Sequence, residues 1–281
     1  MKDAVVVITG ASDGIGLVGA EVLAARGARM VLVGRNQAKC ANAVARIKTA
    51  TGNEKITFEI ADLSLLREVR DLAKRLSETH GHIDVLLNNA GAFTKLRRQT
   101  DEGLEYTFAL NHMAYFVLTG LLLPKLRAAK QGRIINVASG VHRRGRINFD
   151  DLQGLNGYAG WPAYCQSKLM NVLFTHALAR RLAGTSTTAN SLHPGFVASK
   201  FGHNNPGFAG LAMRLAQTLM AISPHAGAKT PVYLAASPDL ATTSGRYFEK
   251  GREVTAAPQS LDEAVQERLW QISAELAASI P

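Results

Sequence analysis

The chain has 281 residues, of which 47% are hydrophobic and 19% charged, and it carries two cysteines and a formal net charge of +10. This length fits one large α/β domain with a sizeable apolar core. Two cysteines without pairing or ligand spacing argue against a disulfide framework and a cysteine-based zinc site, and no metal is expected. The basic residues are scattered along the chain, which argues against a nucleic-acid partner and favours a solvated basic surface.

The longest apolar run, residues 113–123, ends at Pro124 and is too short to span a membrane. We expect it to be a buried core helix. A first strand is expected at residue 4, which leaves no room for a signal peptide. These features predict a cytoplasmic protein without a membrane span.

Short apolar runs alternate with longer segments of helical periodicity. Strands are expected at residues 4–9, 29–33, 56–60, 83–87, 133–138 and 187–192. Helices are expected at residues 15–25, 38–48, 64–79, 104–126 and 161–178. The strand runs are continuously apolar rather than alternating, which predicts burial on both faces. The order predicts a single α/β domain over residues 1–281, a doubly wound Rossmann-type fold with a mostly parallel seven-stranded sheet and helices on both faces.

A segment of about residues 200–223 interrupts this alternation after the sixth strand. It begins with glycines and continues with an amphipathic apolar stretch. Because ligand crevices lie at the carboxyl ends of parallel strands, we expect the segment to be a lid over an apolar substrate. A packing or dimer surface is the alternative. Ser223 and Pro224 then predict a helix start, as N-cap and first helical residue.

Tyr164 and Lys168 are four residues apart in a predicted helix, so their side chains share one face. A cation beside a phenol favours the phenolate. We therefore expect the pKa of Tyr164 to be lowered towards the working pH. Such a tyrosine can exchange a proton with an alcohol or carbonyl oxygen.

A glycine-rich turn, residues 9–16, follows the first predicted strand and opens a helix. Its glycines allow the backbone to approach a dinucleotide's pyrophosphate, and the helix N-terminus supplies donors, although the spacing departs from G-x-G-x-x-G. The second strand ends at Gly34 and Arg35, where an NAD site would have a carboxylate for the ribose 2′-hydroxyl. An arginine can instead bind a 2′-phosphate through two donors, which predicts NADP(H).

Taken together, these motifs resemble those of the short-chain dehydrogenase/reductase family, through nearly the whole chain. The tail, at residues 244–248 and 267–270, resembles the retinol-dehydrogenase-like branch. The resemblance assigns catalysis to Asn111, Ser139, Tyr164 and Lys168. It assigns cofactor contacts to Gly10, Ser12, Asp13, Gly14, Ile15, Gly16, Arg35, Asp62, Leu63, Asn89, Ala90, Gly91, Tyr164, Lys168, Pro194, Gly195, Val197 and Ser199.

Two positions depart from the family pattern. Asp13 stands where NADP-preferring relatives often have Arg or Asn, so Arg35 must carry more of the phosphate selectivity. Ser199 stands where Thr is common, a change that keeps the hydroxyl.

The resemblance also implies a role for each catalytic residue. Tyr164 would be the general acid in reduction and the base in oxidation, with Lys168 lowering its pKa and holding the nicotinamide ribose. Ser139 would stabilise charge on the substrate oxygen, and Asn111 would anchor a proton-relaying water. His142, close after Ser139, either touches the substrate or has no catalytic part.

The predicted function is interconversion of an alcohol and a ketone or aldehyde on an apolar small molecule, with NADP(H). Retinoid, steroid, polyketide and lipid-like substrates all fit. A cofactor-binding regulatory protein with little turnover is the alternative. An epimerase or dehydratase on the same scaffold usually has a longer C-terminal domain. A homo-oligomer is left open.

Overall fold

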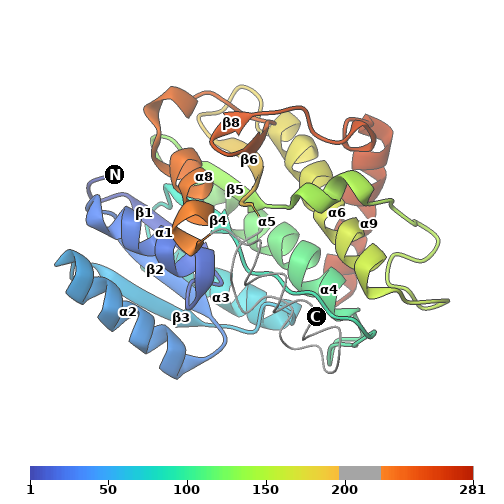
Figure 1. The fold of residues 1–281 in the computed structure, drawn as a ribbon, viewed down its shortest axis with the longest axis horizontal. Coiled ribbons are helices and arrows are strands. Elements are labelled where there is room, and N and C mark those ends of the chain that lie inside the picture. The colour runs from blue at the N-terminus through green and yellow to red at the C-terminus, as the bar shows by residue number, and fades with distance from the viewer. Residues whose placement is uncertain (196–222, 281) are drawn as a thin grey trace.

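The computed structural model describes residues 1–195 and 223–280. These residues form one eight-stranded sheet, with the strand order β3-β2-β1-β4-β5-β6-β7-β8, and the helices that flank it (Figure 1). The strands are β1 (Val5–Thr9), β2 (Arg29–Gly34), β3 (Ile56–Ile60), β4 (Val85–Asn88), β5 (Arg133–Val137), β6 (Thr188–His193), β7 (Tyr247–Glu249) and β8 (Arg252–Glu253). Neighbouring strands from β3 to β7 are parallel, and only the pair β7–β8 is antiparallel. The predicted doubly wound fold is confirmed, with the two-residue β8 as an additional strand.

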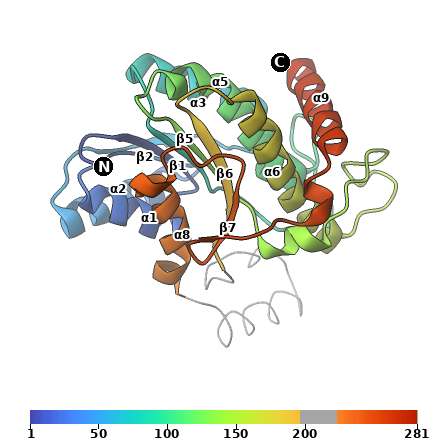
Figure 2. The same cartoon turned by 90° about the horizontal axis from the view of Figure 1, so that it is seen from above.

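Helices cover both faces of the sheet (Figure 2). Their bounds are α1 (Gly14–Ala25), α2 (Gln37–Thr51), α3 (Leu66–Thr79), α4 (Tyr106–Phe108), α5 (Ala114–Arg127), α6 (Gly160–Arg181), α8 (Pro224–Ala236) and α9 (Glu263–Ser279). One face carries α1, α2 and α8, and the other carries α3, α5 and α6. Helix α9 packs on the outer side of α6.

The inner strands are apolar and buried along their whole length, as the sequence predicts. All five residues of β1 and of β5 are buried. The prediction is wrong for β3, where Thr57 is exposed and Ile60 is 37% exposed. Because β3 is the edge of the sheet, one side of the strand has no neighbouring strand and its faces are only partly covered.

Polar side chains cap the helices next to the carboxyl ends of the strands. Asp13 caps α1, and the Asn36 side chain accepts a hydrogen bond from the Lys39 amide at the start of α2. The predicted start of α8 is confirmed, because Ser223 Oγ accepts a hydrogen bond from Ala226 N at 3.2 Å and Pro224 is the first helical residue. The rest of the predicted lid, up to residue 222, lies outside the described residues.

The apolar run at residues 113–123 lies mostly in α5, which a π-helical turn, Ala109–Met113, joins to α4. In the described part of the chain, one helical segment, Tyr106–Arg127, is long and apolar enough to cross a membrane, and 72% of its most apolar window is buried. Leu118 and Leu122 of this segment pack into the hydrophobic core. Its apolar character is therefore accounted for by core packing. The predicted cytoplasmic location stays a prediction.

The order in which strands are added to the sheet reverses between β1 and β4. Strand β1 pairs with β2 on one side and with β4 on the other, so the connections leave the sheet in opposite directions at this point. A crevice opens at the carboxyl ends of the strands at such a switch point, which is where open α/β sheets bind ligands.

Candidate active site

The glycine turn after β1 packs backbone against backbone. A Cβ at Gly10 would lie 2.9 Å from Ala90 Cα, and one at Gly16 would lie 2.5 Å from Gly10 O. Gly10 and Gly14 also have positive φ, 66° and 57°. Gly10 and Gly16 are thus required by the close packing of the turn, and Gly10 and Gly14 by its backbone conformation.

Residues 89–91, directly after β4, connect this turn to the predicted catalytic residues. Asn89 Nδ2 donates to Thr9 O at 2.9 Å and to Gly10 O at 3.2 Å, so this amide nitrogen holds the turn. At Gly91, a Cβ would lie 3.2 Å from Asn111 Oδ1 and 3.4 Å from Lys168 Nζ. One short segment therefore places the turn on one side and two predicted catalytic residues on the other.

The four predicted catalytic residues come together from three parts of the fold. Ser139 follows β5, Asn111 lies in the π-helical turn, and Tyr164 and Lys168 lie on α6. The Ser139 and Tyr164 side chains are hydrogen-bonded, and Lys168 Nζ lies 5.8 Å from the centroid of the Tyr164 ring. Asn111 Oδ1 accepts from Ala92 N at 2.8 Å, which holds this amide in the position it takes beside Gly91 and Lys168.

Burial controls the pKa values of this group. Desolvation raises the pKa of Tyr164, and the hydrogen bond with Ser139 offsets this in part. Desolvation lowers the pKa of Lys168 to about 7. The predicted lowering of the Tyr164 pKa by Lys168 is therefore wrong. Both side chains are buried, so loss of water disfavours both charged forms, and Lys168 Nζ donates to Val137 O at 3.0 Å.

The end of β2 lies against the glycine turn. A Cβ at Gly34 would lie 2.6 Å from Cys40 Sγ and 3.5 Å from Ser12 Oγ. A carboxylate at position 34 would therefore collide with Cys40. The exposed Arg35 donates from Nη1 to the Tyr106 hydroxyl at 3.1 Å.

A second guanidinium lies at the same tyrosine. Arg98 Cζ is 4.9 Å from the centroid of the Tyr106 ring, and Arg98 is exposed. In the described ranges, neither Arg35 nor Arg98 forms an ion pair with a carboxylate. No sequence pattern pointed to Arg98, because only the fold brings the loop after β4 next to the end of β2.

Several residues predicted to contact the cofactor also stabilise the fold. Asp13 Oδ1 accepts from Gly14 N at 2.8 Å, which leaves an exposed carboxylate at the N-terminus of α1. Asp62 Oδ1 accepts from Ser64 N and Ser64 Oγ at 3.0 and 2.7 Å, and Leu63 is buried in the core.

The remaining predicted contacts lie at the same edge of the sheet. Ser12 and Ile15 are half-buried on the turn, and Pro194 and Gly195 directly follow β6. Val197 and Ser199 lie outside the described residues.

Two further aromatic rings stand beside Tyr164. The ring centroids of Phe93 and Trp161 are 5.9 and 6.1 Å from that of Tyr164, and 6.2 Å from each other. Trp161 is 43% exposed. We call Phe93, Trp161 and Tyr164 the aromatic triad. Trp161 lies three residues before Tyr164 on α6, a spacing that places both on one helix face, and this was the available sequence signal.

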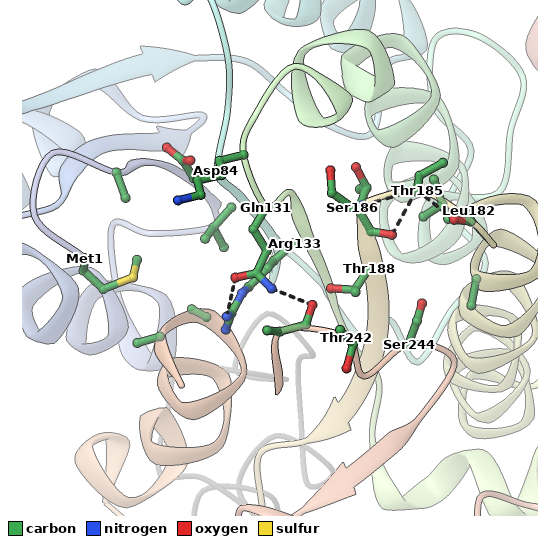
Figure 3. A pocket seen from close by; sticks show the side chains of 18 of the residues that line it. Met1, Asp84, Gln131, Arg133, Leu182, Thr185, Ser186, Thr188, Thr242 and Ser244 are labelled. Carbon is green, nitrogen blue, oxygen red and sulfur yellow. Dashed lines mark hydrogen bonds between the residues drawn. The ribbon is translucent and has the colours of Figure 1, made fainter. Parts of the chain in front are cut away.

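A cavity of about 760 Å³ lies at the amino ends of β4, β5 and β6, at the end of these strands away from the predicted site (Figure 3). Its wall includes Arg133, which donates to Leu234 O in the last turn of α8 and to Gln131 Oε1, each at 3.0 Å. Arg133 thus caps the C-terminus of α8, where the helix dipole favours a cation. None of the predicted site residues that the structure describes lines this cavity.

No cluster of three or more His, Cys, Asp or Glu side chains suited to a metal ion occurs among the described residues. Both cysteines are free and buried. Burial also raises the pKa of each thiol.

The fold, the glycine turn and the converging side chains can be compared with known proteins. The family model for short chain dehydrogenases matches residues 4–207. This chain belongs to the short-chain dehydrogenase family. Members of this family are oxidoreductases that bind a nicotinamide cofactor.

Individual members match most of the chain. Human retinol dehydrogenase 13 is 39% identical over 276 residues, covering 96% of this chain and 83% of that protein. A structure from Mycobacterium paratuberculosis is 30% identical, with a TM-score of 0.79, and the match covers 100% of this chain and 96% of that one. A short chain dehydrogenase of Escherichia coli CFT073 complexed with NADPH is 25% identical, with a TM-score of 0.70. This match covers 90% of this chain and 98% of that one.

Proposed function

We propose that this short-chain dehydrogenase is an NADP(H)-dependent oxidoreductase that interconverts an alcohol with an aldehyde or ketone on an apolar small molecule. The observation that carries the proposal is the convergence of Asn111, Ser139, Tyr164 and Lys168 beside the glycine turn, at the carboxyl ends of β1, β4 and β5. The predicted lid at about residues 200–223 belongs to the same proposal.

The residues of the glycine turn and of the end of β2 fit a dinucleotide that carries a 2′-phosphate. Gly10, Gly14 and Gly16 give the turn the tight backbone course that would bring its amide groups close to a pyrophosphate, next to the α1 N-terminus. Arg35 and Arg98 would hold the 2′-phosphate, and Gly34 leaves no room for a competing carboxylate. The cofactor, when bound, supplies or accepts the hydride. The NADPH complex of the Escherichia coli relative supports this choice.

The chain's own residues move the proton. The raised pKa of Tyr164 keeps the phenol protonated at neutral pH, which is the form needed to protonate a carbonyl oxygen during reduction. Ser139, hydrogen-bonded to Tyr164, would stabilise charge that develops on that oxygen. Lys168 would supply a positive charge beside both when it is protonated.

Binding of NADPH is expected to take up a proton above pH 7. Lys168 has a pKa of about 7 in this structure and loses its charge above that pH. Ribose hydroxyl oxygens that accept hydrogen bonds from Lys168 favour its charged form and raise this pKa, so affinity for NADPH should fall as pH rises, by at most about tenfold per pH unit. Titration calorimetry in buffers of different ionisation enthalpy measures the uptake. Lys168→Met should remove it, and a wild type that takes up no proton would contradict the proposed contact.

The aromatic triad supports an apolar substrate. Its rings offer flat apolar surface beside the candidate proton donor, and Trp161 is partly exposed to receive a ligand. The relatives named retinol dehydrogenases make retinaldehyde a suitable test substrate.

Trp161→Ala is expected to raise KM for retinaldehyde by about tenfold or more, because an aromatic contact contributes roughly 1 kcal/mol beyond its buried area. KM for a small polar carbonyl such as glyceraldehyde should change little. Steady-state kinetics with both substrates measures the difference. Leu155→Ala, at an exposed loop residue, is the control. Equal changes in KM for both substrates would show that Trp161 does not contact the apolar part of the substrate.

A further inference from the structure

His142 is fully buried in the 3-10 helix that follows Ser139, Gly140–Arg144. Both of its ring nitrogens face the backbone. Nδ1 lies 2.7 Å from Ser139 O, and Nε2 lies 3.1 Å from Ala257 N. An amide N–H can only donate and a carbonyl can only accept. Nε2 is therefore unprotonated, and Nδ1 carries the hydrogen.

The imidazole joins the end of β5 to the segment between β8 and α9. Its ring centroid lies 4.5 Å from that of Tyr247, in β7. The neighbouring Arg143 donates to Thr255 O at 2.8 Å, and Gln259 Nε2 donates to Arg143 O at 3.2 Å. His142 is thus held on several sides, and its tautomer is determined by groups that cannot change roles.

The Ser139 backbone takes part in this contact. Its carbonyl oxygen accepts both His142 Nδ1–H and the His142 backbone N–H, the latter at 3.1 Å. Its hydroxyl accepts a longer hydrogen bond from Val141 N, 3.4 Å, and is hydrogen-bonded with Tyr164. The backbone bonds fix the residue, and the hydroxyl is left to act on Tyr164.

We propose that His142 is a positioning residue, which holds the Ser139 backbone through Nδ1–H and so aims Ser139 Oγ at the reacting oxygen. The inference rests on the proposed function, in which Ser139 and Tyr164 act together. A charged imidazole would point an N–H at the Ala257 N–H, so this pair of hydrogen bonds requires a neutral ring. Burial lowers the pKa of His142 to about 4, which keeps the ring neutral at physiological pH.

Paired substitutions separate the two contacts of the ring. The Asn side chain reaches about as far as Nδ1 and keeps a donor for Ser139 O. The Gln side chain reaches about as far as Nε2 and keeps only the acceptor for Ala257 N. We expect kcat to fall on the order of 10²-fold in His142→Gln and in His142→Phe, with KM for NADPH unchanged, because small displacements of a reacting group have effects of this size. His142→Asn should keep most of kcat.

His176→Gln is the matched control, because it removes the Nδ1 donor in the same way. His176 is a half-buried histidine on α6 whose Nδ1 lies 3.0 Å from Ser260 O, so it contacts the same C-terminal segment but no predicted catalytic residue. It should lose thermal stability and keep kcat. Full kcat in His142→Gln, or an equal loss of kcat in His176→Gln, would overturn the inference.

Nitrogen-15 NMR of the wild-type imidazoles keeps the proposal testable if the variants do not fold. The His142 ring should show the Nδ1–H tautomer throughout the neutral pH range, and the Nε2–H tautomer would overturn the inference. Failure of the proposed function has a different signature. In that case Tyr164→Phe keeps full turnover, whatever the His142 variants do.

Discussion

Tyr164→Phe is expected to lower kcat by about 10³-fold or more while NADPH still binds, because it removes the proton donor and only one hydroxyl group. The ring keeps its contacts with Phe93 and Trp161, so the site should retain its shape. Steady-state kinetics gives kcat, and fluorescence titration with NADPH gives the dissociation constant.

Tyr158→Phe is the matched control, since it makes the same chemical change at a hydroxyl that hydrogen-bonds Thr94 and Glu105. This variant should lose some thermal stability and keep its turnover. Substantial turnover in Tyr164→Phe would show that another group donates the proton.

Arg35→Asp is expected to reverse the cofactor preference from NADPH to NADH. The change removes an attraction to the 2′-phosphate and adds a repulsion, and each effect is on the order of tenfold at an exposed site. A shift of about 10²-fold in the ratio of kcat/KM for the two cofactors is the expected result. The measurement is kcat/KM with each cofactor at saturating carbonyl substrate.

Arg26→Asp serves as its control, because it makes the same change of charge at an exposed residue beyond the far end of α1. Its cofactor ratio should stay that of the wild type. Equal efficiency of the wild type with both cofactors would contradict the predicted preference. A variant that still prefers NADPH would exclude Arg35 as the main phosphate contact.

The sheet was predictable because burial leaves a clear pattern in the inner strands. The observed bounds of β1, β2 and β5 lie within one residue of the predicted ones. The edge strand β3 departs from the pattern, since a strand with one neighbour has less apolar surface to cover. The three-residue β7, between Gly245 and Gly251, is too short to have periodicity of its own, and the sequence set no bounds for it.

The site was predictable where chemistry follows from local spacing. Tyr164 and Lys168 share a helix face, so their proximity follows from their spacing, whereas Asn111 and Ser139 were assigned by the family resemblance. The pKa of Tyr164 could not be predicted in this way, because it depends on how much water the folded chain removes.

Contacts between distant segments were also missed. Arg98 reaches Arg35 only through Tyr106, and His142 meets Ala257 across much of the chain. The C-terminal segment helps to bury His142, through Ala257 and the Tyr247 ring. The sequence left open a substrate contact for His142, and both of its ring nitrogens meet backbone groups instead.

The most direct test of the proposed function is product formation from NADPH and a panel of carbonyl compounds, with the wild type and Tyr164→Phe side by side. The panel should include retinaldehyde, a steroid ketone, a long-chain aldehyde and small polar carbonyls. We expect the wild type to oxidise NADPH and form the matching alcohol from at least one large apolar carbonyl, and Tyr164→Phe to form almost none. A wild type that binds NADPH but forms no alcohol from any of these compounds would contradict the proposal and favour a cofactor-binding regulatory protein.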